Sequence, residues 1–336
     1  MKIFLKIIAG FAVVFLLVSG GFYAYLSVEY PKVSPAEKIK IETNNQRLIR
    51  GKYLVENVCD CFGCHSNHDY LSFGFPVKKG TKGQGGFLFD HKLLGLPGDI
   101  YSRNITSYGL KKWTDGEIVR ALRVGVNKDG KALFNFMPYQ QFTLLCQEDI
   151  YSIISYLRSV KAIAYDPPPT KLDFPVNLII QTVPKDAPPF PPAPGKKNLL
   201  EYGRYMTNAA LCAACHTPVD DHGVPLPGME FAGGMEFHFP GGGTIRSLNI
   251  TPDNTGIGEW TKNYFIKRFR LGQKLVNTKT PVKPNEFNTP MPWESYGNMT
   301  DEDLGAIYEY LHNGVKPVKH QVEKFTPSDT PTASAK

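Results

Sequence analysis

An unbroken apolar run lies near the amino end of the chain. Residues 7–26 read IIAGFAVVFLLVSGGFYAYL and contain no charged residue. A helix of about twenty residues spans roughly 30 Å, the thickness of the hydrocarbon core of a bilayer. Lys2 and Lys6 precede the run, so the positive-inside rule leaves the amino end in the cytoplasm. The pattern predicts an inner-membrane anchor over residues 1–30, with the rest of the chain in the periplasm.

A cleaved signal peptide is the alternative interpretation of this segment, because small residues at Val18, Ser19 and Gly20 suit a signal peptidase. The apolar run continues beyond that point, which favours an uncleaved anchor. Both interpretations place the body of the chain outside the cytoplasm, and no second apolar span of this length follows in the sequence.

Two later segments have apolar residues at the spacing of a helix face. Thr300, followed by Asp303, also resembles a helix start with an acidic first turn. The apolar positions are Ile150, Ile153, Ile154 and Leu157 in one segment and Leu304, Ile307 and Leu311 in the other.

These two helices close two similar stretches of chain. Each stretch opens with Gly-Lys/Arg-Tyr, at Gly51 and Gly203, and continues through a cysteine motif, a glycine-rich loop and the tripeptide Asn-Ile-Thr. The repeat predicts two units, residues 45–164 and 199–322, each built of about three helices joined by long loops. The predicted fold is therefore mainly α, with no sustained sheet.

Proline separates the two units. Residues 165–198 contain ten of the 27 prolines, so we expect an extended, non-helical linker that lies along the surface of a domain. The carboxyl-terminal residues 323–336 are polar, and we expect a disordered tail there. The net charge of +7 is spread along the chain without a dense basic stripe, which argues against a nucleic-acid partner and is compatible with a protein or membrane surface.

The candidate chemistry lies in two Cys-x-x-Cys-His motifs, Cys61-Cys64-His65 and Cys212-Cys215-His216. This spacing is typical of covalent haem attachment, in which two thiols bond the porphyrin and the adjacent histidine binds iron. A thioredoxin-like dithiol would need a βαβ pattern, and none is evident. A zinc site would need both motifs to converge on one ion. Two motifs in register favour two covalently bound haems c.

The second axial ligand of each iron is predicted from the repeat. Met137 and Met291 each precede a proline, and they follow His65 and His216 by 72 and 75 residues. A thioether opposite an imidazole raises the haem potential and fills the coordination sphere, which suits electron transfer. The alternatives are a methionine that only fills a gap in the core, and histidine ligation at both axial positions. The repeat does not select the other methionines and histidines of these regions, namely Met229, Met235, Met299, His68, His91 and His238.

Several residues near the Asn-Ile-Thr tripeptides are weaker candidates. Asn104, Asn249, Trp113 and Trp260 either donate hydrogen bonds toward haem propionates or serve as turn and core residues. Arg103 and Arg246 are further candidates for pairing with propionates, although they occupy non-equivalent positions in the repeat.

The motifs together with LNITPDNTGIGEW, MPW and TDEDLGAIYEYL resemble tandem class I cytochrome c domains over about residues 45–320. They are similar to the cytochrome c subunits of membrane-bound bacterial dehydrogenases, which usually carry three haem motifs where this chain has two. In such a domain the first and last helices cross. The resemblance therefore implies a disulfide between Cys59 and Cys146, with two buried free thiols as the alternative.

The resemblance implies an electron-transfer protein and not an enzyme. Its two haems would pass single electrons from a dehydrogenase to an acceptor such as an oxidase or a soluble cytochrome. The alternative is a di-haem redox enzyme of the peroxidase or thiosulfate-oxidising type, which would need one iron with a displaceable ligand.

Overall fold

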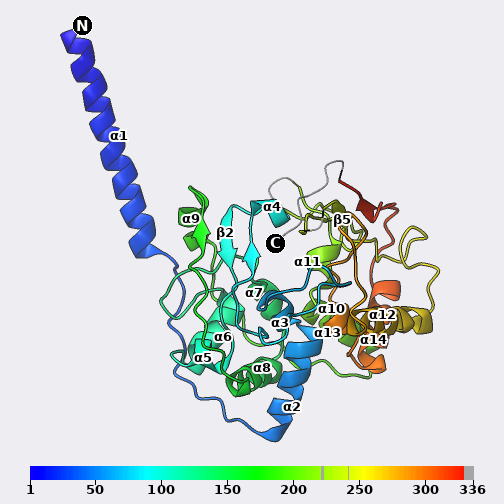
Figure 1. The fold of residues 1–336 in the computed structure, drawn as a ribbon. Helices are drawn as coiled ribbons and strands as arrows, with labels where there is room; N and C mark the ends of the chain where they lie inside the picture. Colours follow the sequence, from blue (N-terminus) through cyan, green and yellow to red (C-terminus); the bar gives the residue numbers. More distant parts are fainter. Residues whose placement is uncertain (221–222, 241, 329–336) are drawn as a thin grey trace.

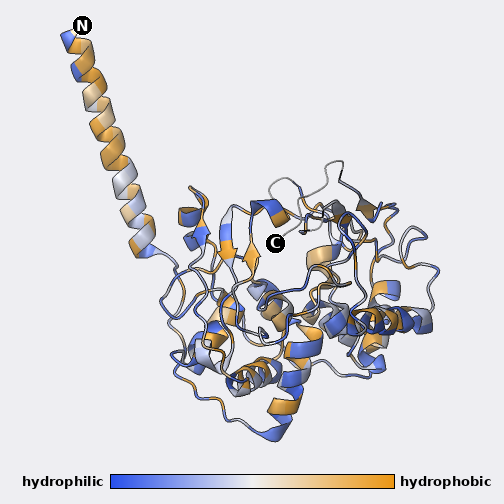
Figure 2. Cartoon of the chain, viewed as in Figure 1, coloured by the Kyte–Doolittle hydropathy of each residue, from blue (hydrophilic) through white to orange (hydrophobic). Residues whose placement is uncertain are grey.

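The computed structural model describes residues 1–220, 223–240 and 242–328 and is mainly helical (Figure 1). Helix α1 (Lys2–Glu29) stands away from the body as a single rod, and it is apolar along most of its length (Figure 2). Within the described residues it is the one helix long and apolar enough to cross a membrane. Leu26 is its one buried residue. The predicted apolar amino-terminal helix is thus confirmed, and its exposure fits membrane anchoring.

The first half of the body, residues 45–164, contains short and long helices and one pair of strands. Helix α6 begins with a capping box formed by Thr114 and Glu117 and ends at Gly125 in the left-handed conformation. The elements are α2 (Asn45–Tyr53), the π-helical turn η1 (Leu54–Val58), α3 (Cys61–Cys64), β1 (Leu88–Phe89), α4 (His91–Leu94), β2 (Gly98–Tyr101), α5 (Ser107–Leu110), α6 (Asp115–Val124), α7 (Tyr139–Phe142) and α8 (Gln147–Ser159).

The second half, residues 199–322, repeats much of this order. Its closing helix begins at Thr300, whose hydroxyl accepts a hydrogen bond from the Asp303 backbone N–H, as the sequence predicted. The elements are α10 (Leu199–Ala209), α11 (Cys212–His216), β4 (Glu236–Phe237), β5 (Thr244–Arg246), α12 (Lys262–Asn277), α13 (Trp293–Tyr296) and α14 (Asp301–Asn313).

In each half the first long helix crosses the last one at a glycine. Helix α2 packs against α8, and α10 packs against α14. A β-carbon built on Gly51 would lie 1.9 Å from the Ser152 carbonyl oxygen, and one built on Gly203 would lie 2.0 Å from that of Ala306. Both distances are far below van der Waals contact, so each crossing requires the absence of a side chain.

One hydrophobic core runs through both halves. The cluster combines residues of α2, η1, α6 and α8 with residues of α10, α12 and α14. The apolar faces predicted for the two closing helices are confirmed, because Ile150, Ile153, Ile154, Leu157, Leu304, Ile307 and Leu311 are all buried in this cluster. The two halves are therefore packed against each other and share one core.

The proline-rich segment departs from the expected extended linker. It forms β3 (Lys171–Leu172), the short helix α9 (Val176–Ile179) and the 3₁₀ turn η2 (Ile180–Thr182). A helix fits there because no proline occurs between Pro175 and Pro184, and Pro175 stands at the amino end, where proline is tolerated. The prediction that this segment is non-helical was wrong at residues 176–182.

Short strands also form two small sheets, β1-β2-β3 and β4-β5-β6. Strand β6 (Phe325–Thr326) pairs with β5 and belongs to the segment expected to be disordered. The prediction of disorder was wrong for residues 323–328, because backbone hydrogen bonds of β6 and a bond from the Ser328 N–H to Asn285 tie this part of the chain down. The remainder of that prediction falls on residues 329–336, outside the described part.

Candidate functional site: two Cys-x-x-Cys-His motifs

Both motifs form one short helical turn that starts after a left-handed residue. Asp60 (φ 45°) precedes α3, and Leu211 (φ 55°) precedes α11. Asparagine and aspartate tolerate this conformation, but for leucine it is a rare one that the surrounding packing must stabilise. The same unusual backbone at equivalent positions indicates that the two motifs share one local geometry.

The two histidines are oriented in the same way. The Nδ1 atom of His65 lies 2.6 Å from the Arg103 carbonyl oxygen, and that of His216 lies 2.6 Å from the Leu248 carbonyl oxygen. Each of these carbonyls belongs to the residue directly before an Asn-Ile-Thr tripeptide. A carbonyl only accepts, so Nδ1 carries the proton and Nε2 keeps a free lone pair. Burial lowers the pKa of both imidazoles. A neutral imidazole fixed through Nδ1 is the form that binds a metal through Nε2.

The four motif cysteines are partly exposed, yet the surrounding protein desolvates their thiols. Cys64 and Cys215 are exposed, and Cys61 and Cys212 are half-buried. Burial nevertheless raises the pKa of all four thiols, to about 12 for Cys212 and about 11 for Cys215. A redox-active Cys-x-x-Cys needs a lowered thiol pKa, so the environment argues against dithiol chemistry.

A shared zinc site is also unsupported. Among the residues that the structure describes, no group of three or more His, Cys, Asp or Glu side chains is placed to hold a metal ion. What each motif offers is a pair of accessible thiols beside a single oriented imidazole. That donor set fits a covalently attached haem better than a tetrahedral ion.

Met137 and Met291 sit in matching turns. The Tyr139 backbone N–H donates to the Met137 carbonyl at 2.8 Å, and the Trp293 N–H donates to the Met291 carbonyl at 2.7 Å. The intervening prolines have similar backbone angles, and each turn leads into a four-residue helix, α7 or α13. Both methionines are half-buried against the common core. The structure thus gives the two methionines one local geometry, while their role as ligands stays a prediction.

Two of the rival histidines have other partners, and the third is exposed. Both ring nitrogens of His68 lie 2.6 Å from carbonyl oxygens, those of Phe75 and Gly63. His238 lies 3.8 Å from the Glu236 carboxylate, and His91 is the exposed first residue of α4. None of the three offers a free ring nitrogen in an environment like that of His65.

The other methionines of the second half have surroundings that differ from those of Met291. Met299 is fully buried in the common core, and Met235 packs against an aromatic cluster near β4. Met229 lines a cavity of about 390 Å³ together with Pro218 and His320, close to the second motif. Met229 is therefore the methionine against which the role of Met291 is best tested.

The two motifs adjoin. The charge of Cys215 would raise the pKa of Cys64, and that of Asp60 would raise the pKa of Cys215, so these side chains interact across the two halves. The Ser295 hydroxyl donates a hydrogen bond to Asp60, and the Tyr296 hydroxyl donates to the Ala210 carbonyl. Helix α13, which follows Met291, therefore packs against the residues that precede each motif.

Sequence reasoning missed Asp60. Burial raises its pKa to about 7, with the neighbouring Glu294 acting in the same direction, while hydrogen bonds from Ser295 and the Gly63 backbone lower it. The available signal was its position, because Asp60 directly precedes the first motif where the second motif has the apolar Leu211.

The residues expected near haem propionates make contacts within the protein. The Asn104 and Asn249 side-chain amides donate to carbonyls in the chain that follows each closing helix, at residues 163 and 165 and at residues 318 and 320. Arg103 donates to the carbonyls of residues 167 and 168, and Arg246 pairs with Glu236. Trp113 and Trp260 are half-buried against the core. The turn-and-core alternative is therefore the one that the structure supports for the asparagines.

The expected disulfide is not formed. Cys59 and Cys146 are both buried free thiols. Cys59 ends η1 and Cys146 caps α8, as predicted, but the Cys146 sulfur lies 3.5 Å from the Tyr205 hydroxyl oxygen of the other half. Burial raises the pKa of Cys59 to about 12, which disfavours the reactive thiolate.

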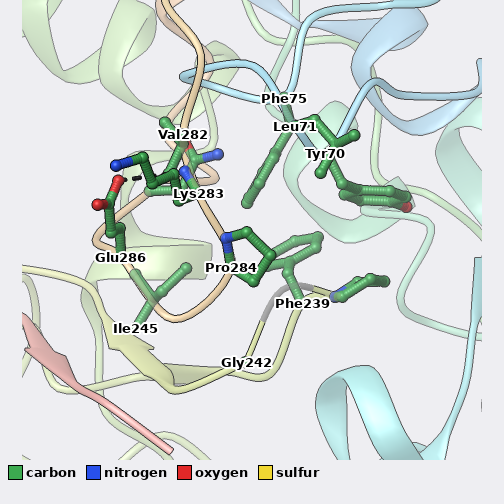
Figure 3. Close-up of a pocket in the computed structure, with 12 residues that line it drawn as sticks. Tyr70, Leu71, Phe75, Phe239, Gly242, Ile245, Val282, Lys283, Pro284 and Glu286 are labelled. Atoms are coloured by element: carbon green, nitrogen blue, oxygen red, sulfur yellow. Dashed lines mark hydrogen bonds between the residues drawn. The ribbon is translucent and has the colours of Figure 1, made fainter. Parts of the chain in front are cut away.

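An aromatic junction joins the halves on the side of β4 and β5. Tyr70, Phe75 and Phe239 pack together there, with ring centroids of Phe75 and Phe239 4.6 Å apart (Figure 3). The cavity beside them has a volume of about 20 Å³, room for a single water molecule. It is a packing junction and holds no space for a ligand.

Comparisons with known proteins agree with these observations. Residues 200–314 match the family described as Cytochrome c. The chain is 29% identical over 303 residues to the cytochrome c subunit of the quinone alcohol dehydrogenase of Gluconacetobacter polyoxogenes, which covers 83% of this chain and 58% of that protein. It is 28% identical to the fructose dehydrogenase cytochrome subunit of Gluconobacter japonicus, covering 84% of this chain and 55% of that one. It is 27% identical to the gluconate 2-dehydrogenase cytochrome c subunit of Pantoea cypripedii, covering 86% and 64%.

The resemblance predicted from the motifs is therefore confirmed. These relatives are named as cytochrome c subunits and not as the catalytic subunits of their dehydrogenases, which agrees with the expected electron-transfer role. This chain spans somewhat more than half of their length.

Proposed function

We propose, on the premise that residues 200–314 are a cytochrome c domain, that the chain is a membrane-anchored di-haem cytochrome c with two tandem domains. Residues 45–164 would form the first domain and residues 199–322 the second. The observation that carries this proposal is the matched local geometry of the two motifs. In both, a left-handed residue precedes the cysteines, a carbonyl binds the histidine Nδ1, and a Met-Pro turn follows at the same place in the fold.

Each half would supply the residues that hold one haem. Cys61 and Cys64 would bond one porphyrin and Cys212 and Cys215 the other, with His65 and His216 as the first axial ligands. Met137 and Met291 would be the second axial ligands. Haem iron, when bound, supplies a one-electron redox change, and this chain contributes no acid or base to it.

The protein itself sets the position and polarity of each site. The carbonyls of Arg103 and Leu248 hold each imidazole in one tautomer and one orientation. The single core that joins the halves keeps the two motifs adjacent without a flexible hinge between them. Both features suit the passage of single electrons from one site to the other with little rearrangement of the protein.

The location and partners follow from α1 and from the relatives. Helix α1 would anchor the chain in the inner membrane, with both haem domains in the periplasm. Since the relatives are subunits of membrane dehydrogenases, we propose a dehydrogenase as electron donor and an oxidase or soluble cytochrome as acceptor.

Mass spectrometry and optical spectroscopy test the proposal together. The intact chain should carry two haem masses, and the oxidised protein should show the weak methionine-to-iron absorption band. Met137→Ala and Met291→Ala should each remove about half of that band, whereas Met229→Leu should leave it unchanged. Fewer than two haem masses would contradict the di-haem proposal. An unchanged band in Met291→Ala together with a halved band in Met229→Leu would reassign the second axial ligand of the haem in the second half.

A high-spin haem in the resting wild-type protein would instead favour the alternative, a di-haem redox enzyme with a displaceable ligand.

A further inference from the structure

We propose that the segment Phe174–Ile179, hereafter the α9 tip, inserts into the bilayer surface beside α1 and forms a second membrane attachment of the body. This inference rests on the proposed membrane anchoring by α1 and extends it. The combination that carries the proposal is an exposed apolar tip, tied to the body by hydrogen bonds, next to the end of α1, the one described helix that is long enough to span a membrane.

The α9 tip lies beside the carboxyl end of α1. Helix α9 and turn η2 both contact α1, and Figure 1 shows α9 next to the place where α1 meets the body. Leu26 is the one buried residue of α1, and Ile180 at the start of η2 is buried as well. The tip is therefore at the level where α1 would leave the hydrocarbon core.

Two large apolar side chains of the tip are exposed. Phe174 is 80% exposed and Ile179 is 54% exposed. Beyond residue 29, Phe174 is the most exposed large apolar side chain in the described part of the chain. An aromatic and an aliphatic residue that protrude together are what a surface entering a lipid interface presents.

The tip is held in place by the body and does not hang loose. Strand β3, just before it, pairs with β2. After it, the Gln181 side chain accepts a hydrogen bond from the Ala132 backbone N–H at 3.1 Å, and the Asp186 carboxylate accepts two from Ser34. These bonds link the tip both to the first half and to the chain that leaves α1, so the exposed side chains are presented at a fixed height.

The neighbouring end of α1 has the composition of a membrane interface. Tyr23 and Tyr25 are exposed, and the Lys32 ammonium lies 5.3 Å from the centre of the Tyr30 ring. Tyrosines and a lysine at this position are typical of the headgroup region. Two apolar side chains are too small a surface for a stable protein interface, whereas insertion into lipid needs only that each be covered. The occupant that fits is therefore the bilayer that α1 enters.

Spin labelling of the full chain tests this inference. Single cysteine variants Phe174→Cys, Leu16→Cys and Leu271→Cys are labelled with a nitroxide and reconstituted into phosphatidylcholine–phosphatidylglycerol vesicles. Leu16 lies in the middle of α1, and Leu271 is an exposed residue of α12 that serves as the matched control. The parent chain, labelled in parallel, gives the background from its own cysteines. The ratio of oxygen to nickel-chelate accessibility then reports the depth of each label.

The label at position 174 should show an accessibility ratio several-fold above that at position 271 and below that at position 16. A ratio at position 174 equal to that at position 271, with position 16 deep in lipid, would overturn the α9 tip proposal and leave the anchor intact. A water-accessible label at position 16 would overturn the proposed anchoring itself, and with it the attachment of the tip.

Discussion

Each half of the body has an aspartate at the third position of its closing helix, Asp149 in α8 and Asp303 in α14. Each aspartate accepts a hydrogen bond from a tyrosine of the other half: Tyr205 donates to Asp149 at 2.6 Å, and Tyr53 donates to Asp303. The same tyrosine hydroxyls accept from the backbone N–H groups of the helix caps, Cys146 and Thr300. The interface between the halves thus uses one arrangement twice, in opposite directions.

The partner that each aspartate finds in its own half is different. Arg50 donates two hydrogen bonds of 2.8 Å to Asp149. At the equivalent place in the second half, Tyr202 donates a single bond of 2.6 Å to Asp303. The first half therefore balances its carboxylate with a cation, and the second half balances it only with two phenols and the helix cap. The two halves therefore place an aspartate at the same position but surround it with different charges.

Substitutions at the two helix crossings should have the largest effect on stability. Gly51→Ala and Gly203→Ala should each lower the free energy of unfolding by more than about 4 kcal/mol, because the new methyl group meets a backbone carbonyl that cannot move aside. Urea unfolding of the purified proteins measures the effect. Gly195→Ala is the control, since a β-carbon there meets nothing within 4 Å, and it should change stability little. A tolerated alanine at position 51 or 203 would contradict the close crossing.

Neutralising the two aspartates sharpens the electrostatic difference. Asp149→Asn leaves the half-buried Arg50 guanidinium without its counter-charge and should cost about 3 kcal/mol. Asp303→Asn removes a carboxylate that has no ion-pair partner among the described residues and should cost only about 1–2 kcal/mol. Glu302→Gln, at an exposed ion pair with Lys196, is the matched control. Equal losses for the two asparagine variants would refute the asymmetry.

Removing the tyrosine hydroxyls tests the interface between the halves. Tyr53→Phe and Tyr205→Phe should each destabilise the protein by about 1–2 kcal/mol, because each deletes a hydrogen bond to a carboxylate. We expect the larger loss for Tyr53→Phe, since Asp303 then retains only Tyr202, whereas Asp149 retains both bonds from Arg50. Thermal unfolding ranks the two variants, and the reverse order would count against this account.

Asp60 provides the most specific difference, because the second half has Leu211 at the equivalent position. Burial raises the pKa of Asp60 to about 7 from 3.8. A folded-state pKa above the unfolded value means that the folded protein binds this proton more tightly. Its contribution to stability is therefore fully present below about pH 4 and is lost as the pH rises to about 7.

Asp60→Asn should remove that loss. Relative to wild type, the variant should become steadily more stable as the pH rises from 4 to 7, because only the wild-type carboxyl loses its proton in this window. Urea unfolding at several pH values in this window measures the gain, with the exposed Asp129→Asn as control. Parallel pH profiles of wild type and Asp60→Asn would show that the carboxyl does not titrate in this range.

Much of the architecture was predictable from local patterns. The apolar run predicted α1, the spacing of Ile150 and Ile154 predicted α8, and Thr300 marked the start of α14. These features are encoded within one or two turns of chain, so a single sequence reveals them. The proline-rich segment was harder, because a short proline-free stretch formed α9 where the average composition indicated an extended chain.

Part of the candidate site could also be predicted from the sequence. The motif cysteines, histidines and Met-Pro turns were identified by spacing and by repetition. The roles of Asn104 and Asn249 were not resolved, because an amide can serve a turn or a ligand equally well, and only the location of the carbonyl partners decides.

The sequence by itself therefore determined the elements and the candidate ligands, since these depend on residues that are neighbours in the chain. Only the tertiary structure decided that the two motifs adjoin, that Tyr53 and Tyr205 reach across to the opposite aspartates, and that Phe174 protrudes beside α1. These arrangements join residues that are far apart in the chain, and their geometry follows from how the helices pack around one core and not from any local pattern.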